Sequence, residues 1–252
     1  MDAIYFCHVA TDICPLLRKE LHAGQKEPTH EGGARDWNPS EKRFNWELVF
    51  CELYAGGKYN NNQGGDYDFS LGTNGLGSCA TQYASEYMDV TVWRDGNKYT
   101  LHFAKGKIKG KMLVEPSDRK KTGTTTRWKP DIEVFTDINI PESYFLDILR
   151  RQAVVNAGVT FRFRAQHGAK FETTEFCYKN GIADFVAELA GENPLTQPYY
   201  IETERKGKDR EDKPEYKVRM SAAFCFSNRT NAIEYYHNSS WLEHGGSPDK
   251  AA

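Results

Sequence analysis

A stretch rich in glycine and asparagine runs directly into a predicted helix and limits the folds open to this chain. Residues 57–77 read GKYNNNQGGDYDFSLGTNGLG, which predicts a loop that a ligand or neighbouring elements must order. Residues 78–87 (SCATQYASEY) predict the helix. Apolar residues at helical spacing over residues 44–54 predict a second helix, which ends at Gly56-Gly57. The fold must therefore hold a long loop between two helices.

This loop carries the elements of an anion site. Glycines at Gly72, Gly75 and Gly77 let backbone amides approach an anion closely, and a helix beginning at Ser78 adds unsatisfied N–H groups and a positive dipole end. Lys58 adds a compact positive charge. Together these features predict a phosphate cradle with a lid. On spacing alone, an ordinary surface loop with normal helix capping is the more frequent outcome of such a pattern.

The rest of the chain alternates between strands and helices. Strands are predicted at residues 88–94, 98–103, 107–114, 123–128, 159–165, 171–178, 199–203 and 218–227. Helices are predicted at residues 141–155 and 181–189. The charged residues 204–217, whose signs alternate, predict a solvated hairpin loop. This order predicts an α/β (α+β) fold in the form of a two-layer sandwich.

Charge and composition exclude several classes of protein. Lys and Arg number 33 against 35 Asp and Glu, a net charge of -2, so no global positive field draws the chain to nucleic acid. Any contact with DNA must come from a local patch or from a partner. The apolar runs are too short to cross a bilayer, and the N-terminal residues do not form a secretory signal. The six scattered cysteines predict free thiols in a cytoplasmic protein.

Six motifs occur in an order that resembles a known family. They read ELYAGGKYNNN, SLGTNGLGSCATQYASEYMDV, KTGTTTRWKPDIEVFT, RRQAVVNAGVTFRFR, YKNGIADFVAELA and SNRTNAIEYYHNSSWLEHGGS. The succession of helix, AGGK, loop, GxxGxG and helix is similar to that of the GHKL ATPases, in the branch of the B subunits of DNA gyrase and topoisomerase IV. The resemblance covers about residues 35–250. It implies a non-matching segment at residues 1–34, a partial GHKL ATPase domain at 35–178 and the first part of a transducer domain at 179–252.

The resemblance also implies a set of nucleotide-binding residues. In the family, the end of the loop wraps the ATP triphosphate, a loop lysine reaches it, and a strand threonine helps to organise the adenine site. The matching positions are Lys58, Gly72, Gly75, Leu76, Gly77, Ser78 and Thr124. For Thr124, a strand hydroxyl that simply bonds to a neighbour stays open as an alternative.

The function that the resemblance implies is that of an ATP-dependent type II DNA topoisomerase, which uses ATP binding and hydrolysis to drive strand passage. Its cofactors are ATP and Mg²⁺. The intact relative forms an ATP-dependent homodimer, works with the breakage-reunion (A-type) subunit, and holds DNA through the whole assembly. No membrane contact and a cytoplasmic location are implied.

Residues 1–34 depart from the family. Ahead of the AGGK helix, family members carry a catalytic Glu, a magnesium-binding Asn and a DxGxG turn, and residues 1–34 show none of these motifs. We therefore assign no catalytic and no metal-binding residue, and we expect a fragment that lacks both functional flanks and is marginally stable alone. Two alternatives stay open. One is a non-hydrolysing remnant that at most binds nucleotide weakly or pairs with a partner; the other is an inactive product.

Overall fold

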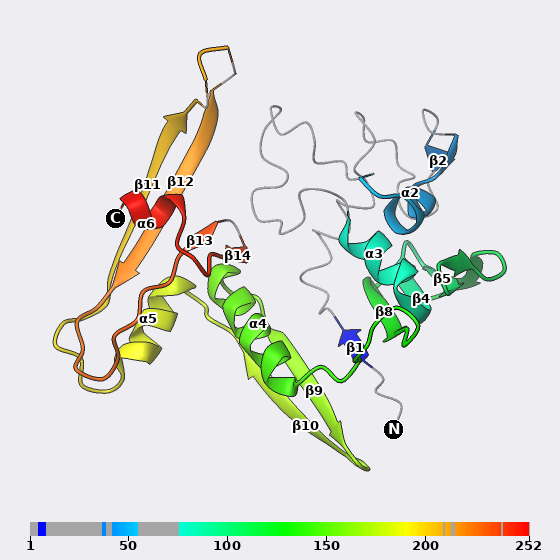
Figure 1. Cartoon of the computed structure of the whole chain (residues 1–252), viewed down its shortest axis with the longest axis horizontal. Coiled ribbons are helices and arrows are strands. Elements are labelled where there is room, and N and C mark those ends of the chain that lie inside the picture. The colour runs from blue at the N-terminus through cyan, green and yellow to red at the C-terminus, as the bar shows by residue number, and fades with distance from the viewer. Residues whose placement is uncertain are drawn as a thin grey trace. The chain divides into compact units, whose positions relative to one another are not determined.

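The described part of the chain divides into two compact units (Figure 1). The computed structural model describes residues 5–8, 37–38, 42–54, 76–208, 210–212, 215–237 and 239–251. One unit ends at Pro141 and the other begins at Glu142. The domain boundary predicted between residues 178 and 179 lies inside the second unit and stays a prediction. None of the helices in these ranges is both long enough and apolar enough to span a membrane.

The first unit is built on a six-stranded antiparallel sheet. Its strands run in the order β1-β8-β4-β5-β6, and β7 also pairs with β5. The strands are β1 (Tyr5–His8), β4 (Ser85–Arg94), β5 (Asn97–Ala104), β6 (Lys107–Ile108), β7 (Leu113–Pro116) and β8 (Gly123–Pro130). A separate two-stranded sheet is formed by β2 (Trp37–Asn38) and β3 (Arg43–Phe44). Although β1 comes from the segment that matches no family motif, it pairs with β8.

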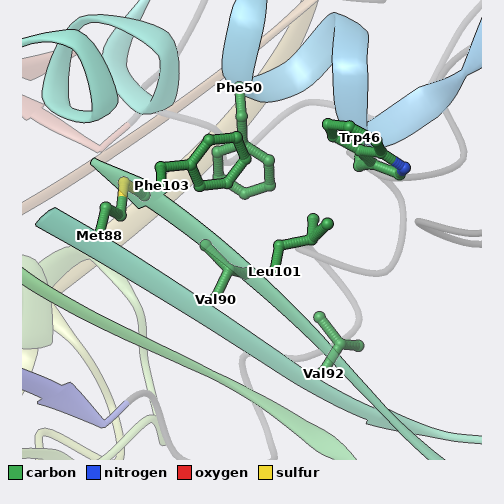
Figure 2. Close-up of a cluster of buried hydrophobic side chains, with 7 residues drawn as sticks. All are labelled: Trp46, Phe50, Met88, Val90, Val92, Leu101 and Phe103. Carbon is green, nitrogen blue, oxygen red and sulfur yellow. The ribbon is translucent and has the colours of Figure 1, made fainter. Parts of the chain in front are cut away.

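Two short helices, α2 (Asn45–Cys51) and α3 (Gly77–Tyr83), belong to this unit. Trp46 and Phe50 of α2 pack on side chains of β4 and β5, as Figure 2 shows. The Phe103 ring centroid lies 5.7 Å from that of Phe50 and 6.3 Å from that of Trp46. The buried cluster consists of Trp46, Phe50, Met88, Val90, Val92, Leu101 and Phe103. A helical layer on the sheet confirms the predicted two-layer α/β sandwich.

The helix predicted at residues 78–87 ends earlier than expected. α3 stops at Tyr83, and Ser85 already begins β4. The Asp131 N–H donates to the Ala84 carbonyl at 3.0 Å, and β4 pairs with β8 from Ser85 onward. Sheet pairing with a distant segment therefore outweighs the local helical pattern at this point.

Positive φ angles mark the turns on either side of β5. Asp95 and Gly96 have φ angles of 51° and 77°, which confirms the turn predicted between β4 and β5. The strand predicted at residues 107–114 is instead two short strands, β6 and β7. Gly110 lies between them, and its φ of 79° interrupts the extended backbone.

The second unit contains helices and antiparallel strand pairs. Its elements are α4 (Glu142–Val155), β9 (Phe161–His167), β10 (Lys170–Phe176), α5 (Ile182–Ala190), β11 (Tyr199–Gly207), β12 (Tyr216–Phe224), β13 (Tyr236–His237), β14 (Ser240–Trp241) and α6 (Ser247–Ala251). The pairs are β9 with β10, β11 with β12, and β13 with β14. The buried cluster consists of Ala153, Val154, Tyr178 and Phe185. The Tyr178 hydroxyl donates to Glu188 of α5 at 2.8 Å, and Arg150 of α4 also bonds to Glu188, which joins the two helices.

The hairpin of β11 and β12 is longer than predicted. β11 extends to Gly207 and β12 begins at Tyr216, so part of the charged stretch 204–217 is strand rather than loop. Arg219 of β12 lies directly opposite Glu204 of β11, with 3.9 Å between their charged groups, and Lys206 of β11 pairs with Glu215 at 3.4 Å. Opposite charges facing each other across the two strands stabilise pairing in a segment whose composition alone suggests a loop.

A half-buried tyrosine makes the stability of the second unit sensitive to alkaline pH. Burial, together with a hydrogen bond from its hydroxyl to Glu234 at 2.5 Å, raises the pKa of Tyr236 far above the ordinary tyrosine value of about 10. Above about pH 10 the unfolded chain releases this proton while the folded chain retains it. The contribution of Tyr236 to the free energy of unfolding is therefore present in full below that pH and falls as the pH rises through it.

We expect the Tyr236→Phe variant, which cannot release this proton, to lose stability less steeply than the wild type between about pH 9 and pH 11. Urea denaturation across that range, followed by circular dichroism, measures the difference. Tyr144→Phe, at an exposed tyrosine, is the control and should follow the wild type. Parallel pH profiles for the wild type and Tyr236→Phe would contradict the prediction.

Candidate functional site

The predicted anion site centres on the first turn of α3. Leu76 precedes the helix with φ −103° and ψ −38°, and its carbonyl accepts the Ala80 N–H at 2.8 Å. Gly77 and Ser78, the first two helical residues, are exposed. Because the first N–H groups of a helix have no partner within the helix, they are available to solvent or to an anion at the positive end of the dipole.

Burial of Cys79 and hydrogen bonds near its C-terminal end hold α3 in the unit. The Cys79 side chain is fully buried, and the Tyr83 hydroxyl donates to the Cys51 carbonyl of α2 at 3.3 Å. The Ser85 hydroxyl donates to the Thr81 carbonyl at 2.5 Å. The first turn is therefore held in place by the rest of the helix.

Gly77 has open space where a side chain would lie. A Cβ built on this residue meets no heavy atom within 4 Å, and its φ is not positive. The fold itself does not need glycine here. The missing side chain instead leaves the amides of the first turn open to close approach by an anion.

Thr124 lies on β8 in the same unit. It faces Val92 of β4 across the two strands, and the Val92 side chain is buried in the cluster beneath α2. Since directly paired residues point to the same side of a sheet, Thr124 shares the face that α2 covers. Within the described ranges, no hydrogen bond or ion pair joins Thr124 to the first turn of α3.

The structure brings part of the predicted site together. Leu76, Gly77 and Ser78 form one helical turn, and Thr124 lies on the helix-covered face of the sheet in the same unit. The other predicted residues lie outside the described ranges: Lys58, Gly72 and Gly75. The binding roles of all seven stay predictions.

One residue of this region, Gln82, was not predicted from the sequence. Its side chain is 1% exposed, and neither its amide nitrogen nor its amide oxygen has a hydrogen-bond partner among the described residues. An unsatisfied buried amide costs on the order of 1–3 kcal/mol. A glutamine in a short helix normally faces solvent, so only its position three residues after the buried Cys79 could have indicated that it lies inward.

The two cysteines of this region are free thiols, Cys79 buried and Cys51 partly buried. Burial, and secondarily the nearby Cys79, raises the pKa of the Cys51 thiol, and burial likewise raises the pKa of the Cys79 thiol. Both thiols therefore stay protonated near neutral pH and are poor nucleophiles. Within the described ranges, His, Cys, Asp and Glu side chains form no group of three or more that could hold a metal ion.

Comparison of the whole sequence with known proteins identifies its relatives. No family model matches the chain. It is 30% identical over 178 residues to the B subunit of DNA topoisomerase 4 from Salmonella typhimurium, a match that covers 69% of this chain and 28% of the relative. It is 31% identical over 155 residues to the B subunit of DNA gyrase from a Synechocystis species, covering 61% of this chain and 14% of the relative. The chain thus spans less than a third of the length of these curated relatives.

A solved structure agrees with this similarity. The ATPase domain of Thermus thermophilus gyrase B, crystallised in complex with an aminocoumarin, matches with a TM-score of 0.51 and 26% sequence identity. The match covers 70% of this chain and 42% of that domain. The mixed α/β fold with antiparallel sheets is therefore that of the GHKL ATPase domains, as the sequence motifs predicted.

Proposed function

We propose that this chain, a homologue of part of the B subunits of bacterial DNA gyrase and topoisomerase IV, serves the ATP-driven step of a type II DNA topoisomerase. The observation that carries the proposal is the open first turn of α3, where Gly77 presents exposed backbone amides without a side chain. This turn lies in the first unit of the chain. The chain as a whole shares its fold, over 70% of its length, with a gyrase ATPase domain.

In this proposal the chain binds the triphosphate of ATP through backbone amides. The N–H groups of Gly77 and Ser78 donate to phosphate oxygens, and the positive end of the α3 dipole favours their charge. Lys58, Gly72, Gly75 and Leu76 complete the cradle. Thr124, on the helix-covered face of the sheet, helps to organise the adenine site. ATP itself supplies the energy that drives strand passage.

The described residues do not fit a magnesium site, because they offer no group of three or more acidic, His or Cys ligands. We therefore derive no step through Mg²⁺. If Mg²⁺ acts here, it arrives with the nucleotide phosphates and ligands from outside the described ranges.

The remaining parts of the proposal concern organisation and partners. Residues 35–178 form the partial ATPase domain and residues 179–252 the first part of a transducer domain, with residues 1–34 outside the match. The partners are DNA, held by the whole assembly, the breakage-reunion (A-type) subunit, and a second copy of the chain in an ATP-dependent dimer. A cytoplasmic location agrees with the free thiols of Cys51, Cys79, Cys177 and Cys225.

A second candidate function is a remnant that binds nucleotide, or a partner, without hydrolysing ATP. The absence of the family's catalytic Glu motif from residues 1–34 favours it. The remnant binds nucleotide at most weakly, and the two functions differ most clearly in turnover. ATP turnover by the purified chain that DNA stimulates and Lys58→Ala abolishes would exclude the remnant.

Replacing Gly77 with valine tests the cradle. We expect Gly77→Val to weaken binding of a non-hydrolysable ATP analogue at least about tenfold, because a branched side chain would occupy the space through which phosphate approaches the amides. Isothermal titration calorimetry with and without Mg²⁺ measures the change. Since a Cβ at this position meets no neighbouring atom, the variant should keep the wild-type fold.

The matched control is Ala80→Val, which adds the same branched side chain at an exposed position further along α3. It lowers helix propensity by less than about 1 kcal/mol but leaves the first turn open, so analogue binding should change little. Equal affinity in the wild type and Gly77→Val would remove α3 from the proposed site.

A further inference from the structure

Although the net charge of the chain is close to neutral, one of its segments is strongly basic. Residues 105–121 read KGKIKGKMLVEPSDRKK, with seven Lys and Arg against two acidic residues. The segment includes β6 and β7, which lie beyond β5 at one edge of the six-stranded sheet. It is therefore a local basic patch of the kind that a chain with a net charge of -2 needs for direct contact with DNA.

The two acidic residues of the segment are already engaged. Glu115 pairs with Lys98 of β5 at 2.9 Å. Asp118 accepts the backbone N–H of Lys120 at 2.9 Å, in the turn that follows β7. Neither carboxylate forms an ion pair with another basic side chain of the segment in the described structure, so they leave most of its positive charge uncompensated.

Five basic side chains remain available on this edge. Each is exposed and forms no ion pair with a described residue: Lys107, Lys109, Lys111, Arg119 and Lys120. The other two basic side chains are engaged. Lys105 pairs with Glu133 at 2.6 Å, and the Lys121 ammonium lies 4.2 Å from the centroid of the Trp93 ring.

Backbone contacts spread these charges along β5. Lys107 faces Ala104 at one end of the strand, and the Lys109 N–H donates to a β5 carbonyl at 2.8 Å. Arg119 lies over the turn at the other end, where a Cβ on Gly96 would come within 2.9 Å of the Arg119 Cγ. β5 has eight residues, so the row of charges extends over about 26 Å.

We infer that the β6–β7 edge, from Lys107 to Lys120, binds the phosphate backbone of duplex DNA without reading its sequence. A length of about 26 Å corresponds to roughly eight base-pair steps, along which a duplex presents a dense, regular row of phosphates. Lysine and arginine side chains at an edge contact phosphates, and contacts of this kind position DNA without specifying bases.

The choice of DNA as the anion rests on the proposed function, whereas the basic edge does not. An acidic protein segment offers the same sign of charge at lower and less regular density. The salt dependence of binding measures how many phosphates the edge neutralises, since each neutralised phosphate of a duplex adds about 0.9 to the slope of log affinity against log salt. With five available cations the slope contributed by this edge should not exceed about 4.5 in magnitude.

The test compares the full chain with a variant in which Lys107, Lys109 and Lys111 are all replaced by alanine. Fluorescence anisotropy with a labelled duplex of about 25 base pairs, repeated over a range of salt concentrations, gives affinity and slope. For the triple variant, we expect the slope of log affinity against log salt to be smaller in magnitude by up to about 2.7. Between about 50 and 200 mM salt, wild-type affinity should then fall roughly 40-fold more than that of the variant.

The matched control replaces Lys206, Lys208 and Arg210 with alanine. This triple variant has the same net charge as the first, but its substitutions lie at the β11–β12 hairpin, where acidic residues alternate with the basic ones. It should keep the wild-type slope and affinity within about twofold. If either triple variant unfolds, the single variants Lys107→Ala, Lys109→Ala and Lys111→Ala replace it, each expected to lower the slope by about 1.

Three results would overturn the inference: no binding of the duplex by the wild type, equal losses in the two triple variants, or equal affinity for polyglutamate and for duplex. Titration of the ATP analogue into the same proteins separates the two proposals. If the chain binds the ATP analogue but not the duplex, only the proposal for the basic edge is rejected. If it fails to bind the analogue but shows the expected salt slope with the duplex, only the nucleotide site is rejected.

Discussion

Replacement of Phe103 by alanine is expected to remove about 3–5 kcal/mol from the free energy of unfolding of the first unit. The Phe103 side chain is fully buried and lies at edge-to-face and tilted angles to the rings of Trp46 and Phe50. Figure 2 shows it between α2 and the strands. Truncation would therefore lose both the burial of an aromatic ring and the ring contacts that hold α2 on the sheet.

Urea denaturation followed by tryptophan fluorescence measures this loss, because Trp46 lies in the same cluster. Leu113→Ala is the matched control. It also truncates an apolar residue on a strand paired with β5, but Leu113 is 61% exposed, so the change should be less than about 1 kcal/mol. Similar losses in the two variants would show that the cluster does not hold the unit together.

The sequence predicted those parts of the fold that depend on neighbours along the chain. The turn at Asp95-Gly96 follows from two residues that tolerate positive φ, and α4 begins at Glu142, one residue after the predicted start at Pro141. The predicted end of α3 was wrong because β4 gains its pairing partner from β8, about 40 residues away. β1 was missed for the same reason, since its partner is also β8.

The candidate site, like the fold, was predictable only where it depends on residues that are neighbours in the sequence. A glycine directly before a helix is visible in the sequence, and the structure places Gly77 at an open helix start. The buried amide of Gln82 was not predictable, because its burial depends on how α3 packs against α2 and β4. The basic edge could be counted in the sequence, but its available charges were identified only from the ion pairs that the folded chain forms.

The other large effect is expected at Gly181, the residue directly before α5. Its φ of 59° and ψ of −127° lie in a region that L-residues with a side chain rarely adopt. A Cβ there would come within 3.2 Å of the Val154 carbonyl and 3.3 Å of the Ala157 Cβ. Strain and crowding act together, so Gly181→Ala should destabilise the second unit by about 3 kcal/mol.

Gly168→Ala separates the two causes. Gly168 lies in the β9–β10 turn with a φ of 63°, but a Cβ there meets nothing within 4 Å, so only the backbone strain of about 1 kcal/mol should appear. Hydrogen exchange measured peptide by peptide gives the local free energy: amides of α5 should exchange on the order of 100-fold faster in Gly181→Ala, while those of β4 and β5 keep their wild-type rates. Equal acceleration in the two variants would mean that crowding against α4 contributes nothing, and that positive φ alone fixes glycine at both positions.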